Sequence, residues 1–238
     1  MTPTLVGRHV ALVPLAIDHV PDLVRAAAED RSTYDFTAVP DSERTMDAYV
    51  ASLLRDRDEG RVIPFAQCLV SESGAIGRAV GCTRFMEIRH PLGRRTAESA
   101  VPDEVEIGGT WLAASVQRTA VNTEAKLMLL THAFETWEVQ RVAICTDARN
   151  ERSRNAILRI GAEFEGVLRS HRPSYVAGEE GTLRDTAVLV PVLLMVCTAT
   201  EFSLVTDTPS IRPLSLRSTH GCAANVLCVC TSPGFMLP

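Results

Sequence analysis

The fold of this chain is set by the segment Glu106–Glu135, EIGGTWLAASVQRTAVNTEAKLMLLTHAFE. It begins with an apolar strand pattern, passes through the polar turn Gln117–Lys126 (QRTAVNTEAK), and continues with the apolar spacing of a helix. The first N–H groups of a helix lack partners within the helix, and the macrodipole adds positive potential there. The turn is therefore a candidate anion site, in which Gln117 and Arg118 supply further donors for a phosphate.

The pattern upstream of this segment alternates short strands with amphipathic helices. We predict strands at His9–Pro14, Pro64–Ser71, Gly77–Ile88 and Glu104–Leu112, helices at Ile17–Glu29 and from the Ser42 cap to Asp58, and a loop at His90–Asp103. The strands at 64–71 and 77–88 are joined by a short turn, which predicts a hairpin.

The pattern downstream completes an α+β fold. We predict helices at Asn122–Trp137 and from the Asn150 cap to Gly161, and strands at Gln140–Thr146, Ala162–His171 and Arg184–Val190. The longer helix is expected to bury one stripe, formed by Leu127, Leu130, Phe134 and Trp137. This order predicts a mostly antiparallel mixed sheet flanked by helices, with one βαβ unit in the second half.

Composition excludes several classes of protein. The net charge of −5 gives no support to nucleic-acid binding. The N-terminus lacks the pattern of a signal peptide, and no apolar run is long enough to cross a membrane, so we expect a cytoplasmic protein. Lys126 is the only lysine beside many arginines, which suggests a GC-rich, bacterial source. Cys68, Cys82 and Cys145 stand apart in strand-like segments and are expected to be buried thiols.

The sequence changes character near residue 190. We predict one domain over residues 1–190 and an atypical tail over 191–238, with four charged residues and four cysteines. The tail is either a disordered extension or aberrant sequence that was never selected to fold. Its cluster of His220, Cys222, Cys228 and Cys230 includes a C-x-C spacing that suits zinc poorly, so we expect no metal site.

Several segments resemble the GNAT acetyltransferase superfamily in order and spacing. The resemblance is carried by the opening segment, by RVAICTDARNERSRNAILRIGAEFEGVLRSH (Arg141–His171), by RDTAV (Arg184–Val188) and by the N-terminal LVGRHVALVPLAIDHVPDLVRA. It looks closest to the branch that includes ribosomal-protein N-terminal acetyltransferases, and it spans roughly residues 3 to 190.

The resemblance implies acetyl-CoA as co-substrate and assigns residues to it. The backbone of the strand ending in Trp111, Leu112 and Ala113 would pair with the pantetheine arm, and a backbone N–H near Leu112 or Ala113 would polarise the thioester carbonyl. The pyrophosphate would lie in the turn formed by Gln117, Arg118, Thr119, Ala120, Val121 and Asn122. Asn150 would bond the pantetheine arm beside Ser153, and Arg154 with Arg149 would reach the 3′-phosphate.

Two positions depart from the superfamily pattern. The phosphate loop usually carries glycine where this chain has Ala120, which would crowd the pyrophosphate or require a positive φ of alanine. Ile157 stands where many members have the tyrosine that protonates the leaving thiolate. In this branch a serine at the position of Ser153 is the usual substitute.

The chemistry needs a proton acceptor, a polarised carbonyl and a donor to the thiolate. Glu104 and Glu106 alternate along one strand, so they share a face and are candidate proton acceptors. Ser153 is the candidate donor. These residues also have purely structural explanations: the two carboxylates can be solvated strand residues, and Ser153, like Asn150, can serve to cap its helix. His132, a further ionisable residue, is expected to be structural.

We therefore expect an acetyl-CoA-dependent N-acetyltransferase that acts on a primary amine, such as a protein N-terminus or a small amine, as a monomer or homodimer. The alternative is a non-catalytic acyl-CoA-binding module. A mononucleotide-binding domain is disfavoured, because neither G-x-x-x-x-G-K-[ST] nor G-x-G-x-x-G is present.

Overall fold

The computed structural model of the protein describes residues 2–93 and 101–191. Residues 192–238 of the atypical tail, with its histidine–cysteine cluster, and residues 94–100 of the expected loop lie outside the described residues.

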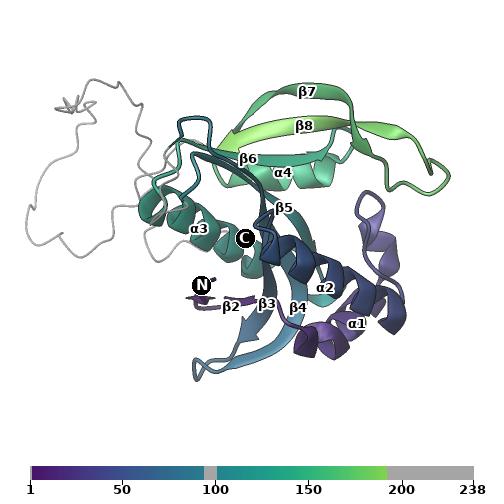
Figure 1. The fold of residues 1–238 in the computed structure, drawn as a ribbon. Coiled ribbons are helices and arrows are strands. Elements are labelled where there is room, and N and C mark those ends of the chain that lie inside the picture. Colours follow the sequence, from purple (N-terminus) through teal and green to yellow (C-terminus); the bar gives the residue numbers. More distant parts are fainter. Residues whose placement is uncertain (1, 94–100, 192–238) are drawn as a thin grey trace, which may run out of the picture. The chain divides into compact units, whose positions relative to one another are not determined.

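Strands of the described part form one mixed sheet in the order β1-β2-β3-β4-β5-β6-β8-β7 (Figure 1). The strands are β1 (Leu5–Val6), β2 (Val10–Pro14), β3 (Ile63–Val70), β4 (Ile76–Arg89), β5 (Glu104–Leu112), β6 (Arg141–Asp147), β7 (Ala162–Pro173) and β8 (Leu183–Pro191). Neighbours pair antiparallel except β5 and β6, which are parallel. The predicted α+β class with one parallel βαβ unit is confirmed.

The parallel pair separates partway along its length. Its pairing runs from Glu104 opposite Arg141 to Glu106 opposite Ala143. Beyond that point β5 continues to Leu112 beside β4, whereas β6 pairs with β8 from Ile144 onward. The two strands therefore diverge, and the backbone edge of β5 that faces β6 is not paired with it over the last residues of the strand.

Four α-helices accompany the described strands: α1 (Val20–Ala28), α2 (Glu43–Asp58), α3 (Ala120–Thr131) and α4 (Glu151–Arg159). α1 packs on β4 and α2 on β3, while α3 contacts β2 and α4 contacts β6, β7 and β8. The short 3₁₀ turns η1 (Ile17–His19), η2 (Arg31–Tyr34) and η3 (Ala114–Val116) join these elements, and α3 ends in a π-helical turn, η4 (His132–Thr136). The predicted Ser42 cap of α2 is confirmed, because its side chain accepts from the N–H of Thr45.

The buried stripe of α3 differs from the prediction. Leu127 is 46% exposed, although Leu130 is buried as expected. The stripe instead runs through Val121, Ala125, Leu129 and Ala133, spaced by four residues, with Lys126 beside it. The apolar pattern in LMLL fits more than one helix face, and packing against the sheet selected the face that leaves Leu127 in solvent. The short strand β1 was not predicted.

Candidate active site

The turn between β5 and α3 has free backbone donors. The N–H groups of Arg118, Thr119 and Ala120 make no hydrogen bond to any described residue, and all three residues are exposed. Thr119 caps α3, because its hydroxyl accepts from the N–H of Val121. The positive φ in this turn falls on Arg118, at 62°, and Ala120 is the first residue of the helix. Consecutive free donors beside a left-handed residue at a helix N-terminus are the geometry of an anion site.

Ala120 therefore does not carry the strain that its sequence position suggested. Its φ is not positive, and its exposed side chain leaves the turn open. At the third residue of α3, Oδ1 of Asn122 is buried without a hydrogen-bond partner among the described residues.

The end of β5 is tied into the protein by its backbone. The carbonyl oxygen of Leu112 accepts from Tyr34 Oη at 2.9 Å and from Gln117 Nε2 at 2.9 Å. The N–H of Ala113 donates to the carbonyl of Val80 at 2.7 Å. The side chain of Gln117 thus orders the turn rather than projecting from it, and the N–H of Ala113 is already engaged by the protein.

The turn between β6 and α4 uses most of its backbone donors internally. Asn150 caps α4, since its Oδ1 accepts from the N–H of Ser153 at 3.0 Å, and Asn150 is 8% exposed. Asp147 accepts from the backbone N–H of Arg149 at 2.9 Å and from its guanidinium at 2.8 and 3.0 Å. Arg149 also donates to Glu179 at 2.7 and 3.0 Å, so its charge is neutralised by two carboxylates.

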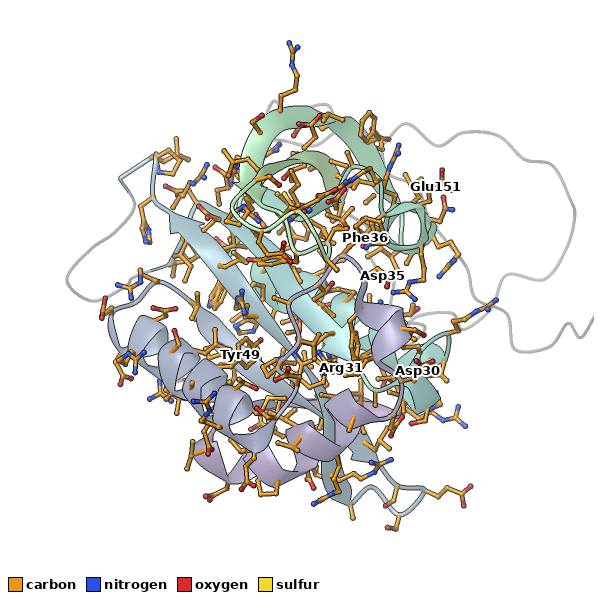
Figure 2. The ribbon with its side chains drawn as sticks, turned by 90° about the vertical axis from the view of Figure 1, so that its right-hand side faces the viewer. Asp30, Arg31, Asp35, Phe36, Tyr49 and Glu151 are labelled. Carbon is orange, nitrogen blue, oxygen red and sulfur yellow. The ribbon has the colours of Figure 1, made fainter. Side chains whose placement is uncertain are left out.

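The connection between α1 and α2 links the two turns (Figure 2). Gln117 Nε2 donates to Oγ1 of Thr33 at 3.0 Å, and Arg152 of α4 donates to the carbonyl of the same residue. Arg149 lies over the ring of Phe36 at 5.8 Å. The predicted cofactor residues of both turns are therefore brought to a common neighbourhood, with η2 lying between them.

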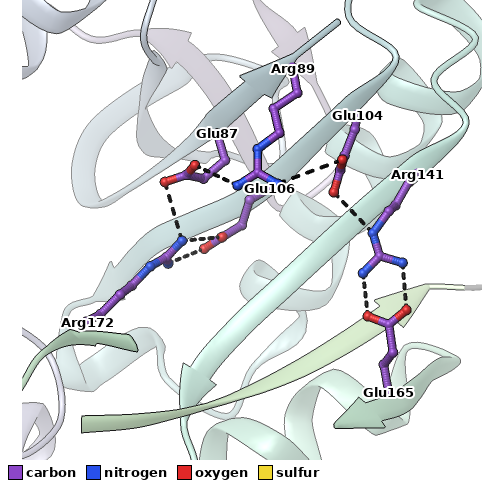
Figure 3. A network of polar contacts seen from close by, with 7 residues as sticks. All are labelled: Glu87, Arg89, Glu104, Glu106, Arg141, Glu165 and Arg172. Carbon is purple, nitrogen blue, oxygen red and sulfur yellow. Dashed lines mark hydrogen bonds and ion pairs between the residues drawn. The ribbon is translucent and has the colours of Figure 1, made fainter. Parts of the chain in front are cut away.

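Glu106 is held by an arginine at the point where β5 and β6 separate (Figure 3). Arg172 of β7 donates to both carboxylate oxygens, at 2.7 Å each, and Glu106 is 5% exposed. Arg172 Nη2 also lies 3.5 Å from Glu87, and these contacts hold the pKa of Arg172 above its usual value. A carboxylate has further lone pairs, so this pairing leaves Glu106 able to accept from another donor, such as a water.

Glu104 is the more exposed of the two candidate carboxylates. It accepts from Arg141 Nε at 3.1 Å, and Arg141 also pairs with Glu165 (Figure 3). Both carboxylates line one cleft of about 180 Å³, which confirms that they share a face. Cys145 lies in the same cleft, and burial raises the pKa of its thiol to about 12, so it is an inert thiol at neutral pH.

Lys126 is buried beneath the diverging part of β5. Its Nζ donates to the hydroxyl of Thr110 at 2.6 Å and to that of Thr83 at 3.4 Å. Burial lowers its pKa to about 7, although the charge of Glu106 acts in the opposite direction. His132, which follows on the same helix, packs against Phe85 and Trp137, in keeping with a structural role.

The remaining candidate residues lie along α4. Ser153 is half-buried at the third position of the helix, and its hydroxyl makes no hydrogen bond to a described residue. Arg154 donates to the carbonyl of Ala148 at 3.3 Å and lies 5.3 Å from the ring of Phe164. Arg154 thus has no carboxylate partner within the described residues, in contrast to Arg149.

Sequence analysis did not single out Arg172, Tyr34 or Thr33. Arg172 lies one residue beyond the predicted end of its strand, and Tyr34 and Thr33 belong to a loop without a motif. Lys126 did carry a signal, because it is the only lysine in an arginine-rich chain, but that signal was interpreted as codon bias.

The residues present fit a nucleotide-type cofactor that carries phosphates. The fit rests on the free donors of Arg118, Thr119 and Ala120 at the start of a twelve-residue helix, beside the diverging strands. Within the described residues, no group of three or more His, Cys, Asp or Glu side chains is placed to hold a metal ion. No helix of the described part is long and apolar enough to span a membrane.

Comparison with known proteins defines the class. Residues 9–163 match the family model described as "Acetyltransferase (GNAT) domain". The chain belongs to the GNAT acetyltransferase family, whose members use acetyl-CoA as co-substrate.

Similar proteins agree with this assignment. A curated Bacillus subtilis (strain 168) protein, "Putative ribosomal N-acetyltransferase YdaF", is 43% identical over 61 residues, which are 26% of this chain and 33% of that protein. The match thus spans about a third of the length of this curated relative. A crystal structure of a "putative acetyltransferase" from T. thermophilus is 30% identical, covers 81% of this chain and 90% of its own, and has a TM-score of 0.61. The structure of RimL, a ribosomal alpha-N-protein acetyltransferase in complex with coenzyme A, is 16% identical over 80% of this chain and 98% of its own, with a TM-score of 0.61, and shows the fold alone.

Proposed function

We propose that the protein transfers the acetyl group of acetyl-CoA to a primary amine, by direct attack of the amine within a ternary complex. The observation that carries the proposal is the open turn Arg118–Ala120, placed beside the diverging strands β5 and β6. The acceptor is a protein N-terminus or a small amine.

The cofactor is proposed to lie along the two turns. The N–H groups of Arg118, Thr119 and Ala120 would hold the pyrophosphate, with Gln117, Val121 and Asn122 completing the turn. Leu112 and Ala113 would flank the pantetheine arm, which Asn150 contacts through its free amide. Arg154 is the better candidate for the 3′-phosphate, because Arg149 is already paired with Asp147 and Glu179.

Glu106 is proposed to accept the proton of the amine through a water. It lies at the last paired position of β5, and Arg172 fixes its orientation. Glu104 is the second candidate, but it lies farther from the separation of the strands. The free hydroxyl of Ser153 is proposed to donate a proton to the leaving thiolate, since Ile157 of the same helix cannot.

The protein is further proposed to be a bacterial cytoplasmic enzyme with a single acetyltransferase domain over residues 1–190, and to act as a monomer or homodimer without nucleic-acid or membrane partners. The support comes from the acidic net charge and the arginine-rich composition.

Calorimetric titration of the full-length chain tests the proposal, with acetyl-CoA as ligand and ATP and NAD as controls. Saturable binding of acetyl-CoA alone, followed by steady release of CoA thiol with an amine panel, is expected. Binding without any CoA release would favour a non-catalytic acyl-CoA-binding module. Failure of the folded protein to bind acetyl-CoA would overturn both.

A further inference from the structure

Neighbouring residues of β8 bury polar atoms that have no partner. Nε and Nη1 of Arg184 and Oγ1 of Thr186 are buried without a hydrogen bond to any described residue. An unpaired buried donor costs about 1–3 kcal/mol, and more when it belongs to a charged group. Both residues belong to the RDTAV motif (Arg184–Val188), and the proposed function uses neither of them.

The unpaired groups point to the face on which the chemistry is proposed. Side chains two apart on a strand share a face, so Arg184, Thr186 and Val188 face the same way. Val188 lines the cleft that contains Glu106. Thr186 is directly opposite Asp147 of β6.

The pairing of β7 with β8 sets two arginines directly opposite each other, Arg172 and Arg184. Like charges at directly opposed positions destabilise a sheet. Arg172 is compensated by Glu106 and Glu87, whereas no ion pair within the described residues compensates Arg184. Asp147, whose charge acts on Arg184, is already engaged by Arg149, and burial lowers the pKa of Arg184.

Arg184 also lines a cleft. Arg184 forms part of the wall of a cleft of about 480 Å³, together with Ala148, Arg149, Glu179, Thr182, Leu183 and Asp185. A volume of this order accommodates a small ligand or the first residues of a peptide. Arg149 and Glu179 of this wall pair with each other, and Asp185 accepts from the N–H of Ser170, so Arg184 is the cation of the wall that has no ion pair within the described residues.

We propose that Arg184, assisted by the hydroxyl of Thr186, binds a carboxylate of the acceptor, so that the preferred acceptors are primary amines that also bear a carboxylate. The inference rests on the proposed function for its orientation, since it places the amine on the side of Glu106. One planar guanidinium matches one carboxylate by two parallel hydrogen bonds. A doubly charged phosphate fits less well, because Asp147 and Glu106 lie on the same face.

The same chemistry has two sources: a free amino acid and a peptide with an acidic first residue. Both are tested on the full-length protein by CoA release, using acceptor pairs that differ in one group. The pairs are alanine against alaninamide, and peptides that begin with aspartate against the same peptides that begin with asparagine. The acid of at least one pair is expected to have a kcat/KM about ten- to a hundredfold higher than its amide.

Variants assign the preference to the arginine. Arg184→Gln is expected to bring the acid-to-amide ratio close to one, and Arg184→Lys, which keeps the charge and loses the paired geometry, to retain part of it. Arg169→Gln, at an exposed arginine of β7, is the matched control and is expected to retain the ratio. Equal use of acids and amides by the wild type, or an equal effect of Arg184→Gln on both, would overturn the inference.

Binding separates this inference from the proposed function. Calorimetry with the same acids and amides measures the preference without turnover. Tighter binding of acids that Arg184→Gln abolishes, in a protein that releases no CoA, would support the carboxylate site and overturn the proposed function. Steady CoA release with no preference for acids in either measurement would support the proposed function and overturn the carboxylate site.

Discussion

The two strand-to-helix turns of the candidate site look alike in the sequence and differ in the structure. Each follows a strand of the parallel pair, and each starts a helix with a capping side chain, Thr119 in one and Asn150 in the other. The β5–α3 turn leaves three consecutive N–H groups free, whereas the β6–α4 turn engages those of Arg149, Asn150, Glu151 and Ser153 internally. Only the first therefore offers an anion several consecutive free N–H groups.

The difference comes from side chains rather than from the helices. In the β6–α4 turn, the carboxylate of Asp147 accepts a hydrogen bond from the N–H of Arg149. The backbone carbonyl of Asp147 accepts one from the N–H of Asn150. The β5–α3 turn has no acidic residue between Ser115 and Thr123, so no carboxylate competes with a phosphate for its donors. A helix N-terminus becomes an anion site when the chain leaves its donors unclaimed.

Reversing a charge in the open turn is expected to have the largest effect. Arg118→Glu should weaken acetyl-CoA binding about a hundredfold, roughly 3 kcal/mol, because a charge-assisted bond is replaced by repulsion of the phosphate. Calorimetric titration measures the change. Arg159→Glu, the same charge change at the far end of α4, is the control and should alter the affinity little. Equal losses in both variants would mean that only overall charge matters.

The comparison extends to the helices behind the turns, because α3 buries an ionisable group. The pKa of Lys126 is lowered to about 7 in the fold, from about 10.4 in the unfolded chain. Between these values the unfolded chain binds more protons, so stability should rise with pH from about 7 towards 10, by up to about 1.4 kcal/mol per pH unit. Below about pH 7 both states are protonated and the fold carries the whole cost of burial.

Urea unfolding of the wild type and of Lys126→Met across pH 6–9 measures this dependence. Other groups titrate alike in both proteins, so the difference in unfolding free energy isolates Lys126. That difference should stay constant below pH 7 and change in favour of the wild type above it. A constant difference across the whole range would show that Lys126 is protonated in the fold throughout.

Proline substitution at the first residue of each helix compares the two turns by removing one backbone N–H, and in the β5–α3 turn it changes no charge. Ala120 is the first residue of α3 and follows an extended Thr119, so proline fits there and removes only the free N–H. Ala120→Pro should weaken acetyl-CoA binding about tenfold, near 1.4 kcal/mol, and leave the melting temperature within a few degrees. Glu151→Pro at the same position of α4 breaks the bond of its N–H to Arg149 and should cost about 1 kcal/mol of stability instead. Unchanged acetyl-CoA affinity in Ala120→Pro, or unchanged stability in Glu151→Pro, would remove the distinction between the turns.

The sequence predicted the elements better than it predicted the site. Periodicity located β5 at Glu104–Leu112, since apolar alternation and turn signals are local properties. It could not choose the buried face of α3, because the run LMLL offers apolar side chains on several faces and the sheet makes the choice. The two-residue strand β1 carries too little pattern to be detected.

The geometry of the candidate site was predictable where it depends on backbone position. The polar turn at Arg118–Ala120 and the shared face of Glu104 and Glu106 follow from chain order and strand alternation. Partners that lie far apart in sequence do not follow, such as Arg172 with Glu106 or Thr33 between the turns. The same holds for Arg184, whose lack of a partner is a property of the folded molecule.

The smallest expected effect concerns Asn150, for which capping and cofactor contact make different predictions. Asn150→Ala removes the cap of Ser153 N–H and should cost about 1 kcal/mol of unfolding free energy. Asn150→Asp keeps an acceptor at the cap but loses the amide donor, so stability should stay near that of the wild type. If the amide contacts the pantetheine arm, acetyl-CoA affinity should fall about fivefold to tenfold in both variants. If affinity is unchanged in the stable aspartate variant, Asn150 serves the fold alone, and cofactor recognition in this protein rests on the open turn.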